Sequence, residues 1–436
     1  MDSQISNEIT KNITEIRNLG SSNISDQEKH SQILKWVKDN YYEVRLELAG
    51  VIHLFPVKEA VEKLLNDPIP KVRIALIENS PQIRKSMDSD FILSALEKTL
   101  NDPIPSVRIS LAKVIRNHLF FTSESVPSLN KRVQSDETPL EAFVRIKIDE
   151  PLLHKGLLID PSDDVRIAAA GNYRHFVVSL GLDFVFIRLL NSLHLIFTDS
   201  QWRVRTIGAE LVFGLAILSP PDFFDHYLYS FYERFLTDPC QKVREYAISA
   251  LPTFVEHFCS LDGTLNGDGT SANNDYSPNI NDETYSASAS DNKNSSNKQK
   301  GIPFYNNYNN ADDEHEERHQ MKWLMKSLIV KLENTLTKED NFINKQTYLL
   351  CLSEIAGYIP IQFLRNTLFL PLIRILKDST QSDNVIILTL DILYDLRDSI
   401  HPFQKNRELK PILDRFLNSR STEVIKERAM RLLNSF

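Results

Sequence analysis

The sequence predicts an all-α protein in which pairs of helices repeat and stack into an α-α superhelix, or solenoid. Two observations predict this class. A short signature recurs six times with an invariant internal spacing, and the apolar residues on either side of it recur every three or four positions, which is the period of a helix rather than of a strand. At 436 residues, 42% of them hydrophobic, the chain has enough apolar side chains to bury a core along such a stack.

The signature is an aspartate followed, six positions later, by an arginine that directly follows a valine. Its copies are the pairs Asp39 and Arg45, Asp67 and Arg73, Asp102 and Arg108, Asp160 and Arg166, Asp199 and Arg205, and Asp238 and Arg244. Successive arginines lie 28, 35, 58, 39 and 39 residues apart, which agrees with two-helix repeats once a larger insertion is allowed between Arg108 and Arg166. Residues 122–140 account for part of that insertion and are predicted to be a loop, with a degenerate helix ending near Ile148.

The two helices of a repeat are predicted on either side of its aspartate. Proline directly follows the aspartate in four repeats and suits a short turn or a first helical position: Pro68, Pro103, Pro161 and Pro239. We expect the aspartate to cap the second helix, which is worth about 0.5 to 2 kcal/mol per cap. The arginine lies about one turn inside that helix and can pair with the aspartate of its own or of a neighbouring repeat. The signature residues are therefore predicted to form a structural Asp–Arg ladder with no catalytic role.

The composition divides the chain into four segments. Residues 1–24 are predicted to be a flexible N-terminus, and residues 25–260 to hold about six repeats. Residues 261–313 are rich in Asn, Ser, Asp and Gly, and predict a disordered insertion because such a segment cannot bury enough apolar surface to offset its ordering entropy. Residues 314–436 are predicted to hold about three helical pairs that lack the full signature.

The composition also argues against several classes of function. The formal net charge of −8 disfavours a general nucleic-acid binder, whose binding face is basic. No apolar stretch is long enough to span a membrane, so the chain is expected in the cytoplasm or the nucleus. Cys240, Cys259 and Cys351 form no C-x-x-C pair, so neither a disulfide framework nor a thiolate zinc site is expected. The partners should then be proteins, not nucleic acids, membranes or small-molecule substrates.

One enzyme-like motif is interpreted as fortuitous. Residues 315–319 read His-Glu-Glu-Arg-His, the H-E-x-x-H pattern that places two imidazoles on one helical face for zinc. Glu339 lies twenty residues beyond His319, at the spacing of a third ligand in thermolysin-like peptidases. Helical periodicity over residues 321–336 would place Glu339 about 30 Å from the histidines, at about 1.5 Å per residue. We therefore expect no enzyme, and assign no catalytic, metal-binding or cofactor-binding residue.

The order of helix, Asp-Pro turn, x-x-Val-Arg and helix resembles HEAT repeats. Within it, residues 197–258 contain F-T-D-S-Q-W-R-V-R-T-I-G-A-E-L, then P-P-D-F-F-D-H-Y-L, then L-T-D-P-C-Q-K-V-R-E-Y-A. This stretch resembles the HEAT-repeat scaffold (A) subunit of protein phosphatase 2A, and a relative such as the HEAT-repeat regulatory subunit of protein phosphatase 4 fits as well. The resemblance implies a non-catalytic scaffold whose five C-terminal repeats hold a serine/threonine phosphatase catalytic subunit through their intra-repeat turns, with a second regulatory subunit as a further partner.

The same resemblance implies which turn residues contact the partner: Gln201, Trp202 and Arg203, and then Gln241 and Lys242 in the next turn. An exposed Trp–Arg pair is the composition of a binding hot spot, worth about 2 kcal/mol or more per residue when a partner buries it. Two alternatives stay open. In one, Trp202 covers the core of its own repeat and Arg203 is solvated. In the other, the chain is a HEAT-repeat adaptor or transport receptor unrelated to phosphatases, which binds cargo on a concave acidic surface.

Overall fold

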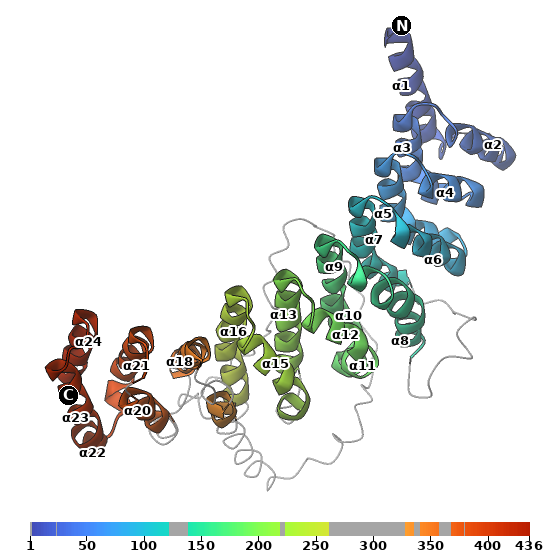
Figure 1. The fold of residues 1–436 in the computed structure, drawn as a ribbon. Helices are drawn as coiled ribbons and strands as arrows, with labels where there is room; N and C mark the ends of the chain where they lie inside the picture. Colours follow the sequence, from blue (N-terminus) through green and yellow to red (C-terminus); the bar gives the residue numbers. More distant parts are fainter. Residues whose placement is uncertain are drawn as a thin grey trace, which may run out of the picture. The chain divides into compact units, whose positions relative to one another are not determined.

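The computed structural model describes residues 2–22, 24–121, 138–218, 223–260, 328–334, 341–356, 368–378 and 380–436. Every secondary-structure element in these ranges is a helix, as predicted (Figure 1). They form two compact units, residues 1–250 and 251–436. No helix in these ranges is long and apolar enough to cross a membrane. The predicted insertion at 261–313 and the motif at 315–319 lie outside the described residues.

In the first unit, helices follow one another in pairs, each joined by a short turn at a signature aspartate (Figure 1). The pairs are α2 (Asp26–Trp36) with α3 (Tyr42–Val51), α4 (Lys58–Leu65) with α5 (Pro70–Ser86), α6 (Ser89–Lys98) with α7 (Pro105–Val114), α8 (Pro139–Phe143) and η5 (Val144–His154) with α9 (Asp163–Ala170) and α10 (Asn172–Leu180), α11 (Leu182–Arg188) and α12 (Leu190–Phe197) with α13 (Trp202–Leu218), and η7 (Phe224–Leu228) and α15 (Tyr229–Leu236) with the start of α16 (Gln241–Ser260). The second helices stack in chain order, with α3 on α5, α5 on α7, α7 on α9 and α9 on α13.

The valine of the signature lies in the core between the stacked helices. All six valines are at most 1% exposed: Val44, Val72, Val107, Val165, Val204 and Val243. Burying such a side chain contributes about 1.5 to 3 kcal/mol relative to leaving it in water. The arginine that follows the valine points about 100° further around the helix, and this places it at the turn instead of in the core.

Helix α1 (Asp2–Asn18) corrects the prediction of a flexible N-terminus over residues 1–24. It packs against α3, with Ile16 and Leu19 each 2% exposed, and thus takes the place of a second helix in the stack. Arg17 binds both carboxylate oxygens of Glu47 on α3, at 2.7 and 3.0 Å. The sequence hides this half-repeat because it lacks the Val-Arg pair.

The first helix of the fourth pair is longer than predicted. Its helical backbone runs from Pro139 to His154, not to Ile148, because Leu152 and Leu153 at its end are buried. From Val144 onwards it is π-helical, a wider winding that holds Pro151, a residue whose ring and missing N–H disfavour the interior of an α-helix. Residues 122–137, where a loop is predicted, lie outside the described residues.

The second unit also contains paired helices. They are α18 (Phe342–Ala356), α20 (Phe369–Lys377) with α21 (Asp383–Asp395), and α22 (Pro402–Gln404), η9 (Lys405–Leu409) and α23 (Lys410–Asn418) with α24 (Glu423–Leu433). Helix α18 packs against α21, and α21 against α24, which repeats the stacking of second helices. Cys351 on α18 is buried and unpaired, and burial raises the pKa of its thiol.

Candidate functional site

The intra-repeat turns of the first unit share one geometry. In each turn, one carboxylate oxygen of the aspartate accepts a hydrogen bond of 2.7 to 2.9 Å from the backbone N–H two residues later, at Tyr41, Ile69, Ile104, Ser162, Gln201 and Cys240. The second helix begins one residue after that N–H in all six turns. The aspartate thus closes an Asx turn ahead of the helix, so the prediction that it caps the helix is wrong.

The arginines join each turn to the next one. The Nε and Nη2 atoms of each arginine donate to both carboxylate oxygens of the following aspartate, at 2.5 to 3.1 Å, in the pairs Arg45–Asp67, Arg73–Asp102, Arg108–Asp160, Arg166–Asp199 and Arg205–Asp238. The Nη1 atom donates to the backbone carbonyl of the aspartate in its own turn, and Arg244 does the same. Each of the five paired guanidinium groups therefore binds its own turn and the next turn at once, whereas Arg244 donates to backbone carbonyls within its own turn.

The ladder continues past both irregular places in the unit. Arg108 reaches Asp160 across 52 residues of sequence, so the insertion between these repeats does not interrupt it. At its N-terminal end, the Asp39 carboxylate accepts from Asn12 Nδ2 of α1 at 3.1 Å. Asn12 thus occupies the place that arginine holds in the other repeats. The ladder fixes the spacing of consecutive turns, and we call this row of turns the ridge.

The turn at residues 199–205 carries the strongest sequence-predicted site residues. Gln201 Nε2 and Arg203 Nη2 both donate to Asp163 Oδ2 of the preceding repeat, each at 2.8 Å, and Arg203 also lies 3.4 Å from Asp164. These hydrogen bonds, from Gln201 first and Arg203 second, hold the pKa of Asp163 below its ordinary value. Trp202, which lies between these two residues in the sequence, is 39% exposed. The alternative in which Trp202 covers the core of its own repeat and Arg203 is solvated does not describe this turn, because Trp202 is exposed and Arg203 is paired with Asp163 and Asp164.

Gln241 and Lys242 lie in the first turn of α16 and are exposed. Gln241 Nε2 donates to Glu245 Oε1 at 2.6 Å, and Lys242 Nζ lies 3.2 Å from Glu245 Oε2. These are local contacts within one helix between exposed side chains, which solvent screens, so they contribute little to stability. The structure does not connect them to Trp202.

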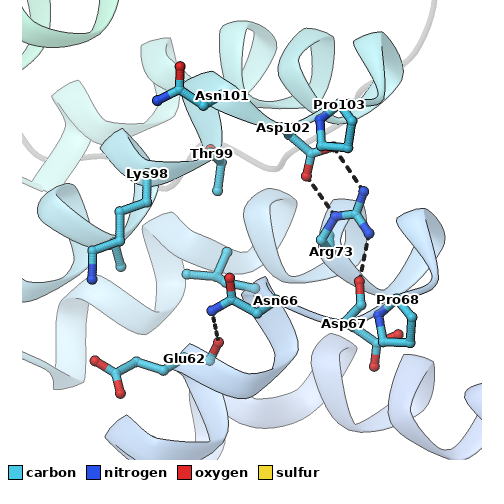
Figure 2. Close-up of a pocket in the computed structure, with 12 residues that line it drawn as sticks. Glu62, Asn66, Asp67, Pro68, Arg73, Lys98, Thr99, Asn101, Asp102 and Pro103 are labelled. Carbon is cyan, nitrogen blue, oxygen red and sulfur yellow. Dashed lines mark hydrogen bonds and ion pairs between the residues drawn. The ribbon is translucent and has the colours of Figure 1, made fainter.

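A groove between the second and third turns was not predicted. It has a volume of about 350 Å³, and Figure 2 shows it between the turns that hold Asp67 and Asp102. Its lining residues are Glu62, Leu65, Asn66, Asp67, Pro68, Arg73, Ala95, Lys98, Thr99, Asn101, Asp102 and Pro103. The only sequence signal for it is the near identity of these two turns.

Two clusters of polar side chains lie inside the first unit. Asp149 accepts hydrogen bonds from Tyr173 and Ser192, and Ser192 Oγ lies 3.1 Å from His154 Nδ1. In nucleophilic catalysis the carboxylate binds the histidine, whereas here it binds the serine, and Ser192 is only 1% exposed. We therefore assign this cluster to packing.

The second cluster joins α5 to the helix that follows α7. Ser80 Oγ lies 3.1 Å from His118 Nε2, and Arg84 donates to the His118 carbonyl at 2.8 Å. Burial, together with the charge of Arg84, lowers the pKa of His118 to about 3, so its ring stays neutral. Among the described residues, no group of three or more His, Cys, Asp and Glu side chains could hold a metal ion.

Comparison with known proteins supports the fold. No protein-family model and no curated protein matches the sequence. The crystal structure of Kap121p bound to Ste12p matches with a TM-score of 0.50 and 12% identity, over 98% of this chain and 43% of that chain. Kap95p, in a structure with RanGDP, matches with a TM-score of 0.38 and 9% identity, over 97% of this chain and 49% of that chain.

The similarity to Kap121p agrees with the predicted class of HEAT-type helical repeats, and at 12% identity it shows the fold alone. The chain spans less than half the length of Kap121p. Neither structure is of a phosphatase subunit, so the finer resemblance to the protein phosphatase 2A scaffold gains no support from them.

Proposed function

We propose that this protein is a non-catalytic HEAT-repeat adaptor that binds a partner protein on the ridge of its intra-repeat turns, with Trp202 as the anchor, Gln201 and Arg203 beside it in the same turn, and Gln241 and Lys242 in the next turn. The observation that carries the proposal is the state of Trp202. A large aromatic side chain is 39% exposed on the ridge, while both of its neighbours are bound to the preceding repeat.

The bonds of Gln201 and Arg203 make this turn suitable for binding. They fix the backbone on either side of Trp202, so a partner would lose little entropy in ordering it. Tryptophan is enriched among residues that dominate binding energy, and truncating such an anchor costs about 2 kcal/mol or more. Arg203 is neutralised by Asp163 and Asp164, so its contribution would be to hold the turn and not to supply a free charge.

Two classes of partner follow from different observations. The fold similarity favours cargo of a transport-type adaptor, since Kap121p has been solved bound to Ste12p, Pho4p and Nup53p. The stretch D-S-Q-W-R-V-R at residues 199–205 favours the second candidate, a serine/threonine phosphatase catalytic subunit.

Affinity capture from the native cells tests the proposal and separates the two classes. We expect Trp202→Ala to lose most of the proteins that copurify with the wild type, and Phe403→Ala to retain them, since Phe403 is an exposed aromatic residue of the second unit. A phosphatase catalytic subunit among the lost proteins selects the scaffold, and its absence selects the adaptor. Equal recovery with Trp202→Ala would refute the site. Arg203→Glu is a poor variant here, because it sets a third carboxylate beside Asp163 and Asp164 and would distort the turn.

A further inference from the structure

Two neighbouring turns of the first unit have almost the same sequence. Residues 65–74 read L-N-D-P-I-P-K-V-R-I and residues 100–109 read L-N-D-P-I-P-S-V-R-I, so nine of ten positions are identical. The ladder uses the aspartate and arginine of each turn, and the core uses the valine. It does not require Asn66 or Asn101, because the other four signature aspartates follow Lys38, Ile159, Thr198 and Thr237.

The groove between these turns, called the twin-turn groove, has a fixed floor. Arg73 donates to the Asp67 carbonyl at 2.6 Å and to both Asp102 carboxylate oxygens at 2.7 and 2.8 Å (Figure 2). Pro68 and Pro103 restrict the backbone of the two turns. The walls are the C-terminal ends of α4 and α6, and the volume of about 350 Å³ suits a short peptide segment better than a folded domain.

The two asparagines offer the groove a matched pair of amides. Asn66 Nδ2 donates to the Glu62 carbonyl at 2.8 Å, which leaves its amide oxygen toward the groove (Figure 2). The exposed Asn101 side chain makes no hydrogen bond to another described residue. A side-chain amide carries the same donor and acceptor as a peptide group. Packed helices lie about 8 to 10 Å apart, and three residues of an extended peptide span about 10 Å, so amides on successive repeats match every third residue of such a peptide.

The groove contains two charged side chains, Lys98 and Glu62, that are not part of the ladder. The aspartates and Arg73 are committed to the ladder, whereas Lys98 and Glu62 are exposed and form no ion pair with each other or with another residue in the described ranges. The groove thus presents one cation and one anion on walls that also carry the two amides. A peptide with side chains of both signs complements it.

We propose that the twin-turn groove binds an extended peptide segment of a partner protein. Its main-chain amides bond to Asn66 and Asn101, an acidic side chain pairs with Lys98, and a basic side chain pairs with Glu62. The third turn, which borders this groove, lies two turns before the Trp202 turn, and the site does not depend on Trp202.

A phage-displayed library of random heptapeptides, panned on the purified full-length protein, provides the probe. The enriched sequences should carry one acidic and one basic residue, and a fluorescent copy of one of them should bind about tenfold more weakly to the double variant Asn66→Ala plus Asn101→Ala. Lys98→Glu should select peptides with a basic residue in place of the acidic one, and Glu62→Lys the converse. Lys113→Glu on α7, outside the groove, is the matched control and should leave the selection unchanged.

Trp202→Ala should also leave the peptide affinity unchanged, so this site and the Trp202 site can fail independently. Thermal melts check the folding of the double alanine variant, because Asn66 has a bond to lose; the two charge reversals change exposed side chains only. Failure of the library to enrich any sequence overturns the proposal, as does equal enrichment on the double variant. Charge reversals that leave the selected sequences unchanged overturn it as well.

Discussion

Five of the six signature arginines each hold two turns together, their own and the next. Arg108 is 8% exposed, and its partner Asp160, from the next repeat, is 6% exposed. The hydrogen bonds to Asp160 raise the pKa of Arg108, so the guanidinium stays charged throughout the accessible pH range. Removing the charged partner of a buried carboxylate leaves that charge uncompensated, even where a backbone N–H such as that of Ser162 still donates to it.

Arg108→Ala should therefore destabilise the first unit strongly. It leaves the Asp160 carboxylate buried without its partner, which costs about 3 to 5 kcal/mol in free energy of unfolding. Arg244→Ala is the matched control, because Arg244 donates to the carbonyls of Asp238 and Pro239 in its own turn, and its loss should cost only about 1 kcal/mol. Urea unfolding followed by circular dichroism measures both, and similar midpoints for the two variants would contradict the importance of the inter-repeat bond.

Asp149 predicts a dependence of stability on pH. Burial raises its pKa to about 6, against the opposing hydrogen bonds from Tyr173 and Ser192. Because the pKa of Asp149 is higher in the folded than in the unfolded chain, protonated Asp149 favours the folded state. This contribution to the free energy of unfolding is complete below about pH 4 and is lost as the pH rises through about 6. Asp149→Asn cannot ionise and keeps acceptor and donor atoms for Tyr173 and Ser192. We expect it to be more stable than the wild type at pH 8, by up to about 3 kcal/mol, with the gain shrinking toward pH 4.5. A gain that is constant across this range would contradict the assignment.

At the scale of the element, α1 behaves as a repeat helix although it lacks the signature. It packs on α3 with Ile16 and the following Leu19 buried, Arg17 binds Glu47 of α3, and Asn12 binds Asp39 in the turn before α3. The hydrogen bond of Asn12 replaces a charged bidentate pair, so α1 is held mainly by its apolar contacts.

Ile16→Ala should consequently release α1 from the stack. The substitution removes a side chain that is 2% exposed and should cost about 2 to 4 kcal/mol, enough to open this helix ahead of the rest of the unit. Ile5→Ala, on the same helix but 37% exposed, is the control. Hydrogen exchange should show loss of protection confined to residues 2–18 in the first variant, and unchanged protection there would mean that α1 is held by its polar contacts instead.

The sequence predicts those elements in which a residue type can play only one structural role. The Val-Arg pairs predict the turns and the fold class, because the valine must be buried and the arginine must reach a carboxylate. Prediction from the sequence fails where the role of a residue depends on which other residue it contacts in the fold. The aspartate is read as a helix cap because the spacing alone cannot distinguish a cap from an Asx turn. Asn12 is not recognised because an amide in the place of arginine has no repeat to match. The surroundings of Trp202 depend on Asp163, which lies 38 or more residues earlier in the chain.

At the scale of the whole molecule, stability in the first unit is carried from repeat to repeat. The second helices from α3 to α13 pack on their neighbours in chain order, and five of the six signature arginines each join their own turn to the next one. Such an array behaves as a chain of nearest-neighbour interfaces, in which a change in one repeat weakens the adjoining interfaces first. The Trp202 turn and the twin-turn groove lie on separate repeats of this array, which is why their substitutions should be independent.

The ladder also distinguishes segments of the chain whose length varies between repeats from segments whose length is constant. Six residues separate aspartate from arginine in all six turns, whereas 22, 29, 52, 33 and 33 residues separate each arginine from the next aspartate. The alignment of consecutive Asp–Arg pairs therefore depends only on the constant spacing within each turn. A reporter domain inserted between Phe121 and Thr138 should leave every Arg–Asp pair of the ladder intact. A single residue inserted between Asp160 and Arg166 should instead disrupt the two pairs that this turn contributes to, Arg108–Asp160 and Arg166–Asp199.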